Sequence, residues 1–133
     1  MQNVNRVEEL PNNTVSATKR IRYKDIIREV RSLGVPPHMK GYRYLCDAIE
    51  LALGITIHYG TAMKVIYPSI AMKNKCSLAS VEKSIRHAIA AAWDINKAHV
   101  LAVVMDETQE YRGVSKPSNM QIITALTENI KYR

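Results

Sequence analysis

Phenylalanine is absent from this sequence, and its aromatic residues are seven tyrosines and one tryptophan. Because tyrosine keeps a polar tip, several of these side chains are expected at the edge of the core. Nowhere do about 18 apolar residues follow one another, which is the length that a membrane-spanning helix needs. Residues 1–20 also lack the apolar segment of a secretory signal. The sequence therefore predicts a soluble, cytoplasmic protein.

Cysteine and histidine are also scarce, and their positions argue against several kinds of site. Cys46 and Cys76 stand alone, without the paired spacing of a zinc site, and are expected to be reduced thiols. The four histidines have no neighbouring carboxylate or cysteine in the pattern of a triad or a metal site, and there is no glycine-rich phosphate loop. We therefore expect no enzymatic activity, no cofactor and no metal.

What the sequence has in excess is positive charge. Lysine and arginine outnumber aspartate and glutamate by 19 to 12, which gives a formal net charge of +7. A field of this sign favours a polyanionic partner. Nucleic acid is favoured over a membrane surface, because the chain lacks a long amphipathic face anchored by Trp or Phe. The alternative is that the charge only keeps the protein soluble.

The hydrophobic periodicity predicts an all-α protein, a compact bundle of about six helices with no sheet. Residues 1–20 are polar and are expected to form a flexible tail or linker remnant, so that the domain spans residues 21–133. A first helix is expected from about Lys19 to Leu33, because Gly34 and two prolines follow it. Its outer face is basic and either reaches phosphates or is solvated: Lys19, Arg20, Arg22, Lys24, Arg28 and Arg31.

The middle of the chain predicts a second helix and an interrupted third. Residues 37–53 carry an apolar stripe at helical spacing, and a proline is tolerated in the first turn of a helix. Residues 54–60 are expected to be a loop. Pro68 lies inside the apolar pattern of residues 61–75, so we expect a kink or a break near Tyr67.

Residues 77–93 predict a helix with two different faces. Ser77 is its expected N-cap, and at about 100° per residue the apolar side chains fall on one side. The packing face comprises Val81, Ile85, Ala88, Ile89 and Ala92, with Trp93 as a further core residue; the other comprises Ala79, Glu82, Lys83, Arg86, His87 and Ala90. A short helix, a turn over residues 74–77 and this charged helix give the outline of a helix-turn-helix, although a charged face can simply be solvated.

The last part of the chain predicts two further helices. The apolar residues 98–105 favour a short buried helix, with a strand as the alternative, and residues 106–117 are expected to be a polar loop. Ser118 and Gln121 have the spacing of a capping box at the start of the last helix. The core side of that helix comprises Ile122, Ile123, Leu126 and Ile130.

Three separated segments resemble one known family, in the same order and at the same separations. They are LGVPPHMKGYRYL at residues 33–45, MKVIYPSIA at residues 63–71 and VEKSIRHAIAAAW at residues 81–93. The chain resembles the C-terminal DNA-binding effector domain of the sporulation-initiation master response regulator of endospore-forming bacteria. The resemblance is strong over residues 21–93 and continues weakly to the last helix through KPSN, residues 116–119.

The resemblance implies a six-helix bundle whose third and fourth helices form a helix-turn-helix that binds a short promoter element. The implied partners are double-stranded DNA, a second copy of the chain as a homodimer or tandem dimer, and RNA polymerase. The residues implied to contact bases are Glu82, Lys83 and Arg86. Those expected to contact the DNA backbone are Lys73, Lys75 and Ser77 near the turn, and His87.

The sequence departs from the family in three places. Lys83 stands where the family usually has arginine, which replaces a bidentate donor by a point charge. Residues 1–20 hold no receiver domain, so the chain is either an excised effector domain or a natural version without a receiver. Residues 98–112, near which the family contacts RNA polymerase, match poorly. A second hypothesis is therefore an interaction module that pairs with a full-length relative and modulates it.

Overall fold

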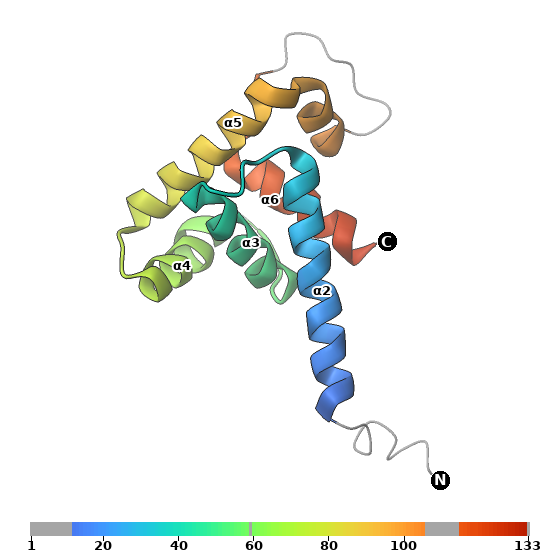
Figure 1. The fold of residues 1–133 in the computed structure, drawn as a ribbon. Coiled ribbons are helices and arrows are strands. Elements are labelled where there is room, and N and C mark those ends of the chain that lie inside the picture. Colours follow the sequence, from blue (N-terminus) through green and yellow to red (C-terminus); the bar gives the residue numbers. More distant parts are fainter. Residues whose placement is uncertain (1–11, 59, 106–114, 133) are drawn as a thin grey trace.

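The computed structural model describes residues 12–58, 60–105 and 115–132, with side chains from Tyr23 onward. This part of the chain is all-helical and contains no strand, which confirms the predicted class. Its elements are α2 (Asn12–Leu33), α3 (Lys40–Leu53), the π-helical segment η1 (Ala62–Ile66), α4 (Tyr67–Asn74), α5 (Leu78–Val104) and α6 (Asn119–Lys131) (Figure 1). These are five α-helices where about six were expected, because two predicted helices are joined in α5.

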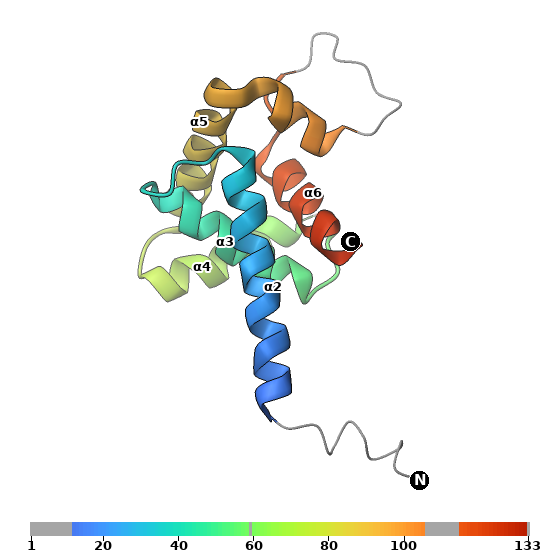
Figure 2. The same ribbon diagram turned by 45° about the vertical axis from the view of Figure 1, so that its right-hand side comes forward.

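Helix α3 lies in the middle of the bundle and contacts every other helix (Figure 2). Its neighbours with the most extensive packing are α5 and α6, and α4 packs in turn against α5. All five α-helices and η1 contribute large, fully buried side chains to one core: Ile26, Val30, Leu33, Leu45, Ile49, Ile66, Ile70, Ile85, Ile89, Ile122, Ile123 and Leu126. Burial of this many branched aliphatic side chains is the main stabilising contribution to the fold.

Two helix starts differ from those predicted. Helix α2 begins at Asn12 and not near Lys19, so part of the expected tail is helical, while residues 1–11 lie outside the described residues. No glycine or proline stands between these two positions to stop the helix. Helix α3 begins at Lys40 and not at Pro37, because the N–H of Met39 donates to the carbonyl of Pro36 in a turn and Met39 is extended.

The predicted irregularity near Tyr67 is present as a change of helix type and not as a break. The chain is π-helical up to Ile66, α4 starts at Tyr67 with Pro68 in its first turn, and the backbone of both Ile66 and Tyr67 is helical. The predicted loop over residues 54–60 is also free of helix and strand where the structure describes it.

Helix α5 contains a kink at Asn96, whose backbone is not helical (φ −150°, ψ 72°). The Asn96 side-chain oxygen accepts a hydrogen bond from the His99 N–H at 3.3 Å, so it caps the second half of the helix. Residues 98–104 are helical, and the alternative of a strand is therefore wrong. Of the predicted loop 106–117, residues 106–114 lie outside the described residues.

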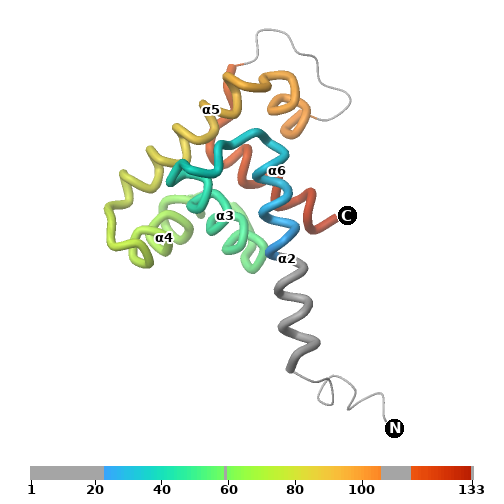
Figure 3. Tube along the Cα trace, in the orientation of Figure 1, coloured from blue at the N-terminus to red at the C-terminus, as the bar shows by residue number. Residues whose placement is uncertain are grey.

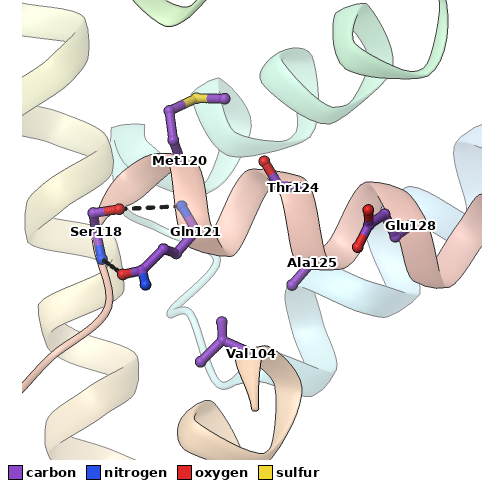
Figure 4. Close-up of a pocket in the computed structure, with 7 residues that line it drawn as sticks. All are labelled: Val104, Ser118, Met120, Gln121, Thr124, Ala125 and Glu128. Atoms are coloured by element: carbon purple, nitrogen blue, oxygen red, sulfur yellow. Dashed lines mark hydrogen bonds between the residues drawn. The ribbon is translucent and has the colours of Figure 1, made fainter. Parts of the chain in front are cut away.

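The capping box at the start of α6 is confirmed. The Ser118 hydroxyl accepts from the Gln121 N–H at 3.2 Å, and the Gln121 side chain accepts from the Ser118 N–H at 2.8 Å (Figure 4). Three of the four predicted core residues are buried, and Ile130 is half-buried against the core. Among the described helices, none has both the length and the apolar character that crossing a membrane requires.

Candidate nucleic-acid interface

The interface candidate is built on α4, a tight turn and the first half of α5, which lie at the side of the molecule away from the C-terminus (Figure 3). Lys75 ends α4 in the left-handed conformation (φ 53°), and the Cys76 N–H donates to the Ala71 carbonyl at 3.0 Å. The Ser77 hydroxyl then accepts from the Ser80 N–H at 3.0 Å, which confirms Ser77 as the N-cap of α5. The reversal between the two helices therefore takes only three residues, 75–77.

The two predicted faces of α5 are confirmed. All five residues predicted for the packing face are buried, and Lys83, Arg86 and His87 on the opposite face are exposed. Trp93 is only half-buried: it packs against the core, and the Lys97 ammonium lies 5.1 Å from the centre of its ring. One side of α5 is thus fixed by the core while the other carries its charges into solvent.

Glu82 and Arg86 form a two-pronged ion pair on the exposed face. Arg86 Nε lies 3.1 Å from Glu82 Oε2, and Arg86 Nη2 lies 3.4 Å from Glu82 Oε1. The pair follows from the i, i+4 spacing of a glutamate that precedes an arginine on a helix. Both side chains remain partly exposed, Glu82 at 37% and Arg86 at 49%, so the pair is open to a ligand.

Three of the residues predicted to contact the DNA backbone are also exposed: Lys75, Ser77 and His87. Within the described residues, Lys75, Lys83 and His87 have no ion-pair partner within 4.0 Å. Their charges and donors are therefore available to an anion without breaking a pair.

Lys73 differs from the other predicted phosphate contacts because it has a structural partner. Its ammonium lies 3.4 Å from Oδ1 of Asp47, a carboxylate in α3 that is almost completely buried. The other carboxylate oxygen of Asp47 has no hydrogen-bond partner among the described residues. Lys73 is 64% exposed, so it can face a phosphate, but it also neutralises a buried charge.

The sequence interpretation did not identify the part that Asn119 and Tyr67 take in this face. The Asn119 side-chain amide donates to the Tyr67 hydroxyl and to the Glu82 carbonyl, both at 3.1 Å, and to Glu82 Oε2 at 3.4 Å. Burial raises the pKa of the Tyr67 hydroxyl; the hydrogen bond from Asn119 acts against this shift, and the Glu82 charge adds to it. The KPSN segment and the capping box located the start of α6, but neither signal shows that Asn119 contacts α5.

The described residues contain no cluster of three or more His, Cys, Asp or Glu side chains that could hold a metal ion. Cys46 and Cys76 are both free thiols, Cys46 in the core and Cys76 half-buried in the turn, where its sulfur lies 3.8 Å from the Tyr44 hydroxyl. The polar groups of this face are thus suited to hydrogen bonds and ion pairs.

An all-helical domain that presents glutamate, lysine and arginine on the outer face of a packed helix has features typical of DNA-binding regulatory domains. The family model described as Sporulation initiation factor Spo0A C terminal matches residues 26–130. The chain therefore belongs to this family of DNA-binding effector domains of sporulation response regulators, which is a regulatory family and not an enzyme family. The matched range includes residues 98–112, where the resemblance in the sequence is weakest.

Proposed function

We propose that this chain regulates transcription by binding a short promoter element in the major groove, with α4 and α5 acting as a helix-turn-helix. The observation that carries the proposal is the outer face of α5, where Lys83 and Arg86 are exposed and Glu82 is partly exposed, while the opposite face is packed into the core. A rigid helix with polar side chains of both signs on its outer face meets the needs of base contact.

The base contacts follow from the donors and acceptors of these side chains. Glu82 can accept from the N4 amino group of cytosine, and Arg86 can donate in bidentate fashion to O6 and N7 of guanine. In the free protein the two side chains pair with each other, so the carboxylate and the guanidinium lie side by side on the outer face of α5. Lys83 adds a point charge next to them.

The backbone contacts would come from the turn and from the flank of α5. Lys73, Lys75 and Ser77 lie around the turn, and His87 lies one residue beyond Arg86. Contacts of this kind determine register and affinity but carry no base information. Binding as a homodimer or as tandem copies, and contact with RNA polymerase, belong to the same proposal and are supported by the family alone.

A fluorescence-anisotropy titration at several salt concentrations tests the proposal. It compares a duplex that carries a promoter element of the family with a scrambled duplex of equal composition. We expect the wild-type protein to bind the element more tightly than the scrambled duplex, and Arg86→Ala to reduce this preference by the contribution of one base contact. Lys75→Ala should lose affinity equally on both duplexes, with the salt slope lower by about 0.9. Equal affinity of the wild-type protein for both duplexes would contradict the proposal.

A pull-down with an immobilised full-length relative, run beside this titration, tests the second hypothesis, that of an interaction module. Such a module would be retained by an immobilised full-length relative and would bind neither duplex at physiological salt. Lys75 and Lys83 favour DNA binding, because both are exposed, neither has an ion-pair partner among the described residues, and their positive charges attract an anionic surface.

A further inference from the structure

We infer that Asn119 is a positioning residue of the DNA interface, which fixes the Glu82 carboxylate and, through it, the Arg86 guanidinium. The inference rests on the proposed function, because it assigns a task to a residue that lies behind the proposed base contacts. Asn119 is the first residue of α6, in a different part of the chain from α5.

The hydrogen bonds of Asn119 define the orientation of its amide. Its nitrogen lies 3.1 Å from the Glu82 carbonyl, 3.1 Å from the Tyr67 hydroxyl and 3.4 Å from Glu82 Oε2. Two of these atoms can only accept, so the amino group and not the carbonyl of the amide must face α5. With two hydrogens and three acceptors, one hydrogen is shared.

Asn119 can act as an anchor because it is itself held on a rigid support. The side chain is buried, with the residue 8% exposed, and the capping box immediately around it fixes the start of α6. Ile122 and Ile123, about one turn further on, are fully buried in the core. Functional groups that are supported in this way lose less conformational freedom on binding.

Tyr67 completes the anchor from a third helix. It is the first residue of α4 and is 3% exposed. Since burial raises the pKa of its hydroxyl, the group is neutral at physiological pH and accepts from Asn119 as a phenol. The single amide of Asn119 thus connects α4, α5 and α6 at the side chain proposed to contact a base.

The anchor restricts Glu82 without covering it. Glu82 Oε2 accepts from Asn119 on one side and from Arg86 Nε, at 3.1 Å, on the other. A hollow of about 370 Å³ borders Tyr67, Glu82, Arg86 and Asn119. The carboxylate and the guanidinium therefore keep an open side toward a ligand while their other side is fixed.

The test compares Asn119→Ala with Gln121→Ala. Both variants remove side-chain hydrogen bonds from the first turn of α6, but no hydrogen bond joins the Gln121 side chain to Glu82 among the described residues. We expect Asn119→Ala to lower the ratio of element to scrambled-duplex affinity by about 3- to 10-fold, with the salt slope unchanged. Gln121→Ala should lower the melting temperature and leave the ratio unchanged. A wild-type ratio in Asn119→Ala, or the same drop in both variants, would overturn the inference.

A Glu82→Ala background separates positioning from a general structural effect. If Asn119 acts through Glu82, the Asn119→Ala change should have no further effect on the affinity ratio once Glu82 is gone. Should Asn119→Ala fail to fold, Asn119→Ser keeps a polar side chain but removes the amide that reaches Glu82; it should lower the ratio, and an unchanged ratio would overturn the inference. If the wild-type protein itself bound the element and the scrambled duplex with equal affinity, the proposed function would be contradicted. The failure of the inference and the failure of the proposed function are therefore distinguishable.

Discussion

Lys83 is the proposed base contact at which this chain departs from the residue that the family usually has. It is exposed next to the Glu82–Arg86 pair, and within the described residues it has no ion-pair partner. Lysine contributes a strongly hydrated point charge, whereas arginine presents a planar fork that matches the edge of a guanine. If Lys83 is a base contact, as we propose, we therefore expect this chain to keep its affinity for the DNA backbone and to discriminate less at one base pair.

The Lys83→Arg variant should recover this discrimination. A good bidentate contact contributes about 1 to 3 kcal/mol of base discrimination, so the affinity ratio for guanine over other bases at one position should rise roughly tenfold. Titration of duplexes that differ at single positions measures the ratio. His87→Arg adds a guanidinium to the same face and serves as the control, with an increase of affinity on all duplexes. If Lys83→Arg instead raised the affinity for all duplexes by the same factor, the proposed base contact would be contradicted.

The two thiols should differ sharply in reactivity. Burial, with added repulsion from Asp47 and Glu50, raises the pKa of the Cys46 thiol to about 12. At pH 8 Cys46 is thus protonated and shielded, and we expect a thiol reagent to modify Cys76 first and Cys46 only after unfolding. Modification of both thiols at similar rates in the folded protein would contradict this assignment.

The raised pKa of the Cys46 thiol also predicts how the stability of the folded protein depends on pH. The folded state binds the Cys46 proton more tightly than the unfolded chain does, so stability is retained below the ordinary pKa of 9.0 and lost as the pH rises toward about 12. Chemical unfolding at pH 8 and pH 10.5 should show a smaller decrease of the unfolding free energy in Cys46→Ala than in the wild type. An equal decrease in both proteins would show that Cys46 does not contribute.

At the scale of helices, the position of α5 depends on its close approach to α3. A Cβ atom added at Gly41 would overlap the carbonyl oxygen of Ser84 and lie 2.6 Å from the Cβ of Ala88. Both neighbours belong to the first half of α5, which carries the proposed base contacts. A glycine is required at position 41 because the two backbones are in contact.

Gly41→Ala should therefore destabilise the domain by about 3 kcal/mol or more, since overpacking against backbone cannot be relieved by a side-chain rotation. Gly54→Ala is the matched control: its nearest neighbour is the Leu51 carbonyl at 3.7 Å and its φ is −99°, so we expect a change of less than about 1 kcal/mol. Urea denaturation followed by circular dichroism measures both. Equal stability of the two variants would contradict the described contact between α3 and α5.

Helix ends and faces were predictable where a local signal specifies them. Ser77 and Ser118 cap helices because their hydroxyls can accept a free N–H, and Gly34 ends α2 with a φ of 103°. The start of α3 was not predictable from Pro37, because the turn from Pro36 to Met39 competes with the helix there.

The site was predictable only in the residues that lie on one helix. Glu82, Lys83 and Arg86 share the exposed face of α5 by helical spacing alone, and the family resemblance drew attention to them. The contact of Asn119 with Glu82 joins residues 37 positions apart, and no pattern along the chain encodes it. The pair of Lys73 with Asp47 was not predicted for the same reason, being 26 positions apart.

At the scale of the whole molecule, the charge, the fold and the family indicate the same kind of partner. The net charge of +7 provides an attraction for polyanions that depends on salt, and the family match over residues 26–130 includes all of α3 to α5 and most of α6. Charge alone would attract any duplex, so we assign the proposed sequence preference to the exposed side chains of α5.

The claim that α5 contacts bases specifically is tested most directly by selecting bound duplexes from a random DNA pool at physiological salt and sequencing them. We predict that the wild-type protein enriches one short element, and that Arg86→Ala loses the enrichment at one base pair of that element while still binding DNA. A folded protein that retains DNA from the pool without enriching any sequence would contradict the claim that α5 contacts bases specifically.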